Sequence, residues 1–124
     1  MLGGTGGGAV NVNVSGYVGA TGAASPSIYA QSSQNGGRST SGAPVTININ
    51  QNATISGGAD YYHGGDGRLR ESRYSTAITT QTDLRNEPSN AVNVNGIVTS
   101  VGGASSSAIF SYGGTTFVHN APTG

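Results

Sequence analysis

The most regular feature of the chain is a strict alternation of β-branched and polar residues. It is clearest in Val10-Asn-Val12-Asn-Val14 and in Val45-Thr-Ile47-Asn-Ile49. A period of two places alternate side chains on opposite faces of an extended strand, and Val and Ile favour strands. No comparable stretch shows the 3.6-residue period of an amphipathic helix. The pattern therefore predicts an all-β fold.

Turn residues divide this pattern into separate strands. We expect strands over residues 9–18 (bent near Gly16), 27–31, 45–50, 53–56, 76–82, 91–112 (as strand, turn, strand) and 115–118. The glycine-rich residues 1–8 are expected to form a flexible lead-in. Residues 32–43 are expected to form a loop, and residues 84–90 a turn, because proline ends most strands.

One segment of the chain occurs twice. VNVSGYVGATGAASPSIYAQ at 12–31 returns in looser form as VNVNGIVTSVGGASSSAIFSY at 92–112, with one inserted residue, and a weaker copy starts at Ile47. Internal repeats of this kind are typical of solenoids, in which each unit covers the apolar face of its neighbour. We therefore predict one repeat domain over residues 9–124.

The repeat resembles the β-helical passenger domain of autotransporter outer-membrane proteins. The first copy matches that family's pattern at Val12, Val14, Gly16, Val18, Gly22, Ser25, Ile28, Tyr29, Ala30, Gln31 and Ser32, followed by the glycine-containing segment 34–37. The second copy matches at Val92, Val94, Gly96, Val98, Ser105, Ile109, Phe110 and Ser111, followed by 112–114. The resemblance covers about half of the chain. It implies a right-handed parallel β-helix with a few irregular rungs, and a protein at the bacterial cell surface or secreted from it.

In such a fold, equivalent strands of successive rungs stack about 4.8 Å apart. Val and Ile would then form inward columns. Asn residues at outward positions would form ladders, and the candidates are Asn11, Asn13, Asn48, Asn50, Asn93 and Asn95. Both ends of a solenoid are open sheet edges, so self-association through the ends is expected unless they are capped.

Composition narrows the function classes. Five arginines balance five acidic residues, so the formal net charge is zero and no long-range field attracts nucleic acid. The chain has no cysteine, which excludes a disulfide framework and a thiolate metal site. No apolar run is long enough to span a membrane, and the first residues lack the basic and apolar regions of a signal peptide. We expect no cofactor.

Residues 57–75 differ from the rest of the chain. This segment, GGADYYHGGDGRLRESRYS, holds three of the five arginines and three of the six tyrosines, and we interpret it as an insertion that protrudes from the repeat. Tyr and Arg are enriched at contact hot spots, and aromatic rings also stack on sugars. The candidate contact residues are Tyr61, Tyr62, His63, Arg68, Arg70, Arg73 and Tyr74.

The same segment offers weaker alternatives. Asp60, His63 and Asp66 resemble a single copy of a calcium-binding glycine-rich repeat, but that motif needs tandem copies, so a solvated loop is preferred. His63 with Asp60 or Asp66 also suggests acid–base chemistry, with Ser72 or Ser75 as a nucleophile, but the segment has no nucleophile elbow. Asp83, Arg85 and Glu87 lie close together, as do the clustered charged residues with which some β-helices cleave polysaccharides, but they lie in a proline-containing turn. A surface ion pair between Asp83 and Arg85 is the preferred interpretation. We predict no metal site and no catalytic site.

The sequence thus leads to one functional prediction and two alternatives. The prediction is a non-enzymatic segment of an autotransporter-type passenger, an extended scaffold for adhesion or cell–cell contact. Its partners would be a host-cell surface, a glycan or like cells, with no nucleic acid and no membrane insertion. The alternatives are an extracellular fibre subunit that assembles through its open ends, and a fragment of a β-helical carbohydrate-active enzyme or phage fibre.

Overall fold

A computed structural model describes residues 2–5, 8–22, 25–33, 43–58, 61–63, 65–71, 76–82, 88–101, 106–113 and 115–121. Within these ranges the chain forms strands and no helix, as the alternation of the sequence predicts. The all-β prediction is therefore confirmed.

Eleven of the strands form three sheets in which every pair is parallel. Sheet I contains, in spatial order, β2 (Val10–Val14), β5 (Val45–Ile49), β10 (Pro88–Val94) and β13 (Thr115–Asn120). Sheet II contains β3 (Tyr17–Gly19), β6 (Thr54–Gly57) and β11 (Ile97–Ser100). Sheet III contains β1 (Leu2–Thr5), β4 (Ile28–Ser33), β9 (Thr76–Thr82) and β12 (Ser107–Tyr112). The remaining strands, β7 (Tyr61–His63) and β8 (Leu69–Glu71), form an antiparallel pair of their own.

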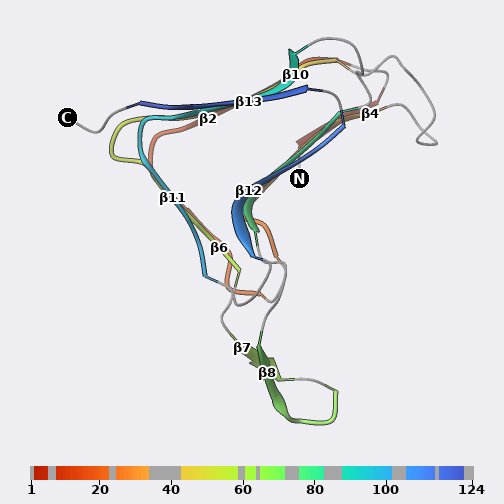
Figure 1. Ribbon diagram of the computed structural model, residues 1–124, viewed down its shortest axis with the longest axis vertical. Helices are drawn as coiled ribbons and strands as arrows, with labels where there is room; N and C mark the ends of the chain where they lie inside the picture. The colour runs from red at the N-terminus through yellow and green to blue at the C-terminus, as the bar shows by residue number, and fades with distance from the viewer. Residues whose placement is uncertain are drawn as a thin grey trace.

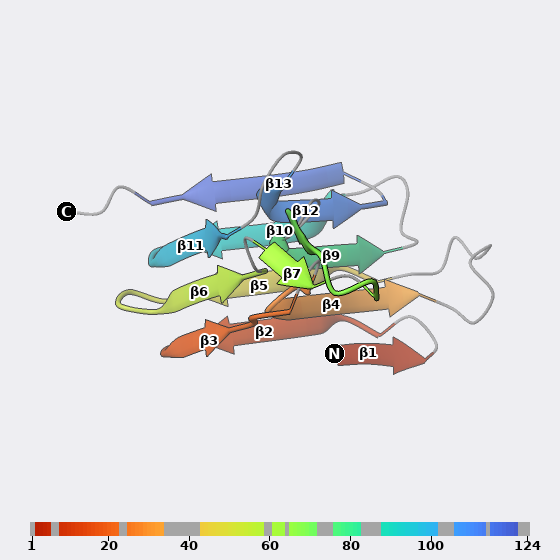
Figure 2. The ribbon, with the colours of Figure 1, turned by 90° about the horizontal axis from the view of Figure 1, so that it is seen from below.

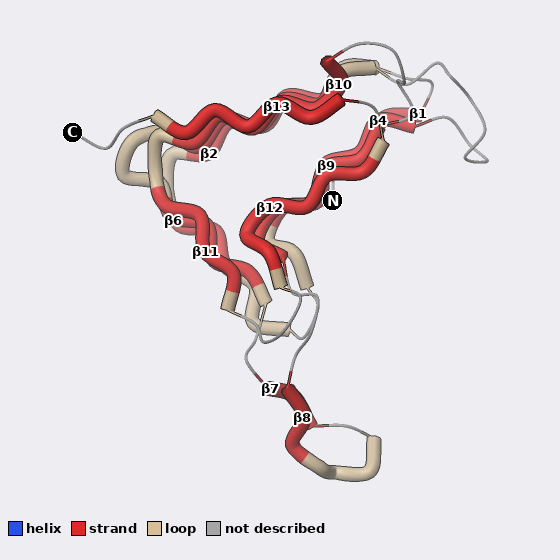
Figure 3. Tube along the Cα trace, in the orientation of Figure 1, coloured by secondary structure: helices blue, strands red, loops and turns tan. Residues whose placement is uncertain are grey.

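The chain visits the three large sheets in a fixed order. From β2 onward it passes through sheets I, II and III three times and then returns to sheet I as β13. Figure 1 shows the sheets as three sides of a triangle, and Figure 3 shows their strands superimposed along the view. Figure 2, from the side, shows successive circuits layered from β1 at one end to β13 at the other.

Strand register confirms the internal repeat residue by residue. In sheet I, Val12 and Val92 both pair with Ile47, and Val92 also pairs with Val118. Val18 and Val98 both pair with Ile55 in sheet II, and Ile28 and Ile109 both pair with Ile78 in sheet III. The extra residue of the second copy lies between the paired segments, so it disturbs neither column.

The core is the interior of the triangle, and it is best covered in the middle circuit. Ile47, Ile55 and Ile78, one from each sheet, are completely buried. Val12 and Val18 of the first circuit occupy equivalent positions but are only half-buried and pack against this cluster. Val12 and Val18 are covered by a circuit on one side only, which leaves them less buried than Ile47 and Ile55.

An asparagine ladder follows the outer side of sheet I. Asn48 donates from Nδ2 to Oδ1 of Asn13 at 2.8 Å, and Asn93 donates in the same way to Asn48 at 2.8 Å. Asn50 instead donates to the hydroxyl of Ser15 at 2.8 Å. Asn11 has no asparagine beside it, because Thr46 occupies the paired position. The ladder prediction is confirmed for one column.

Asn48→Ala is expected to lower the free energy of unfolding by about 1–2 kcal/mol, because Asn48 is the middle member of the ladder and its loss removes two hydrogen bonds. Urea denaturation would measure this change. Asn11→Ala is the matched control, since Asn11 is an exposed asparagine on the same strand as Asn13. Equal losses in the two variants would show that the ladder contributes nothing.

Two expectations about the chain were wrong. Leu2–Thr5, expected to be flexible, form β1 and pair in parallel with β4. Pro88, expected to end a strand, is the first residue of β10. A proline is tolerated there because the first residue of a strand can do without an N–H. The predicted loop over 32–43 and turn over 84–90 otherwise lie largely outside the described residues.

Candidate contact hairpin

The β7–β8 hairpin lies within the predicted insertion, between β6 of sheet II and β9 of sheet III. Its two strands pair only with each other in the part of the chain that the structure describes. In Figures 1 and 3 the hairpin points away from the triangle at the corner where those two sheets meet. The insertion therefore contains ordered strands instead of the loop that the sequence indicates.

The turn of the hairpin is held by its own aspartate. Gly65, Asp66, Gly67 and Arg68 are all exposed. Oδ1 of Asp66 accepts a hydrogen bond from the backbone N–H of Arg68 at 3.1 Å, and Gly67 between them has a φ of 76°. Glycine adopts this left-handed conformation without steric cost, and aspartate commonly accepts from the backbone two residues ahead.

The hairpin brings most of the predicted contact residues into one short element. Its register pairs Tyr62 with Arg70, Tyr61 with Glu71, and His63 with Leu69. Arg68 lies beside them in the exposed turn. The other two candidates, Arg73 and Tyr74, lie outside the described residues.

The weaker candidate sites gain no support from the described part of the chain. In the proposed calcium-binding group, Asp60 lies outside the described residues, and Asp66 accepts a hydrogen bond within the turn of the hairpin. Ser72, Ser75, Asp83, Arg85 and Glu87 also lie outside the described residues. Among the described residues, no three His, Cys, Asp or Glu side chains are close enough to hold a metal ion together.

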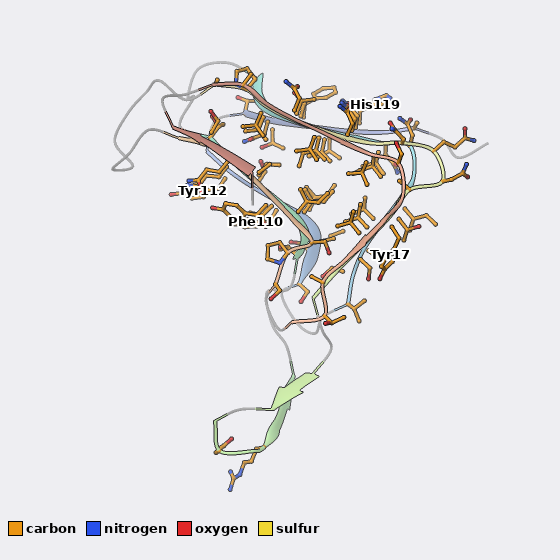
Figure 4. The ribbon with its side chains drawn as sticks, turned by 180° about the vertical axis from the view of Figure 1, so that it is seen from behind. Tyr17, Phe110, Tyr112 and His119 are labelled. Atoms are coloured by element: carbon orange, nitrogen blue, oxygen red, sulfur yellow. The ribbon has the colours of Figure 1, made fainter. Side chains whose placement is uncertain are left out.

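A second surface lies at the end of the stack that contains β13, but its exposed apolar side chains were not singled out from the sequence. We call it the C-terminal end face. It consists of the edges of β11, β12 and β13. These strands also contain five exposed large apolar residues: Ile97, Phe110, Tyr112, Phe117 and Val118. Figure 4 shows Phe110 and Tyr112 on the outer side of sheet III, His119 on the outer side of sheet I, and Tyr17 on the outer side of sheet II.

Comparisons with protein-family models, with curated proteins and with solved structures found no match to this chain. The described residues contain no helix long and apolar enough to cross a membrane. The hairpin and the end face are therefore assessed on their own geometry.

Proposed function

We propose that the chain is a right-handed parallel β-helix that serves as a scaffold. The support is the fixed order in which the chain visits the sheets, together with the residue-by-residue register between circuits. In Figure 1 the path runs counter-clockwise, from sheet I to II to III, as it comes toward the viewer. Such a path is right-handed, which is also the hand favoured for connections between parallel strands.

The proposed role is that of a non-enzymatic segment of an autotransporter-type passenger at the cell surface or outside the cell. The observation that carries this proposal is the projecting hairpin, since a stiff stack of parallel strands presents one Tyr- and Arg-containing element away from its body. Tyr and Arg supply large contact area and directional hydrogen bonds at interfaces. The proposed partners are a host-cell surface, a glycan or like cells.

The hairpin proposal predicts loss of binding without loss of fold. The triple variant Tyr61→Ala, Tyr62→Ala, Arg70→Ala is expected to weaken binding of the chain to cells or to a glycan array by at least about tenfold, since one hot-spot side chain commonly contributes more than about 1 kcal/mol. Circular dichroism should remain unchanged, because β7 and β8 pair with no strand of the three large sheets.

Tyr17→Ala is the control for this experiment. Tyr17 is an exposed tyrosine, 73% accessible, on sheet II and outside the hairpin. Equal loss of binding in the control and in the triple variant would contradict a hairpin-specific contact. Cleavage of a polysaccharide by the purified chain would contradict the non-enzymatic role and favour a carbohydrate-active enzyme.

A further inference from the structure

The outer side of sheet III has a different composition from the asparagine ladder of sheet I. Inward residues of its middle strand, such as Ile78 and Thr80, are completely buried. The outward positions form two rows across β4, β9 and β12. The first row is Tyr29, Thr79 and Phe110, and the second row is Gln31, Gln81 and Tyr112. We call these six residues the sheet III platform.

Two aromatic rings of the platform are open to solvent. Phe110 is 50% exposed and Tyr112 is 62% exposed, and Figure 4 shows both on the outer side of sheet III. They lie two residues apart on β12, or about 6.6 Å along the strand. Tyr29 lies two strands away, or about 9.6 Å. Exposed aromatic residues gathered on one face are typical of a binding surface.

Hydroxyl and amide groups lie beside these rings. The hydroxyl of Tyr29 donates to Oε1 of Gln81 at 2.6 Å, a bond between neighbouring strands that orients both side chains. Gln81 also has two N–H donors on Nε2, and it occupies the position paired with Tyr112. Thr79 occupies the position between Tyr29 and Phe110. Each ring therefore has a neutral hydrogen-bonding side chain next to it.

The platform is uncharged. The whole of β4, β9 and β12, with the sequences IYAQSS, TAITTQT and SAIFSY, contains no Asp, Glu, Lys, Arg or His. A charged partner therefore gains no electrostatic complementarity on this face. Protein contact hot spots commonly combine aromatic residues with arginine, and the platform has no arginine. A partner that is neutral and rich in hydroxyl groups fits this surface better.

The platform faces sideways from the stack of circuits. In Figures 1 and 2 the strands of sheet III are layered along the axis of the stack, and the outer side of the sheet is parallel to that axis. Any further circuit would add a strand at an edge of this sheet, because strands pair in the plane of the sheet. Further circuits would therefore lengthen the platform instead of covering it. The platform is thus compatible with a segment of a longer scaffold.

We propose that the sheet III platform binds a neutral polysaccharide chain. A sugar ring has an apolar C–H face that packs on an aromatic ring, and hydroxyl groups at its edge that donate and accept hydrogen bonds. Phe110 and Tyr112 supply the first contact, and the amide of Gln81 supplies the second. Because the aromatic rings are spread over three strands, several linked sugars are needed to contact all of them. This site is additional to the hairpin, whose strands pair with no strand of sheet III.

Affinity electrophoresis tests the proposal in gels that contain hydroxyethylcellulose, xyloglucan or galactomannan as neutral polymers, or alginate as an anionic polymer. At least one neutral polymer is expected to retard the chain. The double variant Phe110→Ala, Tyr112→Ala should weaken this binding by at least about tenfold, while circular dichroism stays unchanged because both side chains are exposed. No retardation by any neutral polymer would overturn the proposal, and so would stronger retardation by alginate.

Phe117→Ala is the matched control. Phe117 lies on β13 of sheet I and is 62% exposed, the same fraction as Tyr112. It is expected to leave the retardation unchanged. Weakening equal to that of the double variant would mean that any exposed ring suffices, and would overturn the proposal.

Oligosaccharides of the retained polymer provide a second measurement by isothermal titration calorimetry. A hexasaccharide is expected to bind at least about tenfold more tightly than a disaccharide, because only the longer chain spans the rings of β4 and β12. Equal affinities would contradict binding along the platform.

The hairpin variant separates this site from the hairpin. The triple variant Tyr61→Ala, Tyr62→Ala, Arg70→Ala shares no residue with the platform and is expected to keep the retardation. Loss of retardation in the triple variant, with the double variant unaffected, would assign the polysaccharide to the hairpin and overturn only the platform proposal. Self-association of the chain that the double variant abolishes, without retardation by any polymer, would indicate a protein partner and would also overturn it.

Discussion

Ile47→Asp is expected to unfold the chain. Ile47 is completely buried at the centre of sheet I, between Val12 and Val92 in the paired strands. An unpaired carboxylate in this position costs several kcal/mol, which is comparable to the whole stability of a typical domain. Loss of the β-type circular dichroism spectrum at neutral pH would be the measurement.

The matched control makes the same chemical change at an exposed isoleucine. Ile97 begins β11 and is 56% exposed, so Ile97→Asp should leave the spectrum intact. Milder changes at Ile47 should be graded, with Ile47→Val costing about 0.5–1.5 kcal/mol and Ile47→Ala about 2–5 kcal/mol in urea denaturation. A folded Ile47→Asp protein would mean that Ile47 faces outward and that the strand register is wrong.

The strands and their inward faces were predictable because the signal for them is local. Alternation of Val or Ile with Asn or Thr fixes which face of β5 points inward, and the structure places Val45, Ile47 and Ile49 there, all completely buried. The repeat then predicted which strands lie side by side, since Val12 and Val92 occupy equivalent positions. Both inferences can be made from the amino-acid sequence without any knowledge of long-range contacts.

Strands made by long-range pairing were not predictable in the same way. Nothing in LGGT is typical of a strand, and β1 exists because the edge of β4 is available to it. Glycine loses more conformational entropy on folding than other residues, so local propensity favours a flexible segment. The energy of pairing to β4 competes with that cost, and the sequence of residues 1–8 contains no information about it.

The polar corner between sheets III and I also escaped prediction. Ser32 donates from its hydroxyl to the carbonyl of Gly8 at 2.9 Å, and Thr82 donates to the carbonyl of Ala43 at 2.9 Å. Both hydroxyl residues are almost completely buried, as is Asn90, whose Nδ2 donates to the carbonyl of Gly113 at 2.8 Å. In a sequence, polar residues next to a predicted turn are normally expected to have solvent-exposed side chains. Here they are buried because backbone groups at the corners need partners.

The candidate contact segment was located by composition, but its structure was not. A cluster of Tyr, Arg and Gly in 57–75 distinguishes an insertion from the repeat, whereas the pairing of Tyr62 with Arg70 depends on the intervening turn. That turn forms through Asp66, which the sequence suggested as a metal ligand or catalytic partner for His63. An aspartate can stabilise a turn or contribute to a metal or catalytic site, and only the backbone geometry shows which of these two roles Asp66 has.

Gly96→Ala is expected to destabilise the chain by about 1–3 kcal/mol, the usual cost of forcing extra atoms into packed structure. Gly96 lies at the corner between sheets I and II, directly above Ala53 of the preceding circuit. A Cβ on Gly96 would lie 2.4 Å from the carbonyl oxygen of Ala53 and 2.7 Å from that of Asn50. These are backbone atoms, so they cannot move aside as a flexible side chain would, and urea denaturation should show the loss.

Gly16→Ala is the control that the repeat itself supplies. Gly16 occupies the equivalent corner one circuit below Ala53, and a Cβ placed on it meets nothing within 4 Å. Because alanine also reduces the entropy of the unfolded chain, Gly16→Ala should be neutral or stabilising by up to about 1 kcal/mol. The two glycines are identical in the repeat pattern, so their different responses would come from stacking alone. Equal destabilisation by both changes would mean that the loss in Gly96→Ala does not come from contact with Ala53 and Asn50. No loss in Gly96→Ala would mean that the circuits pack less closely than the structure shows.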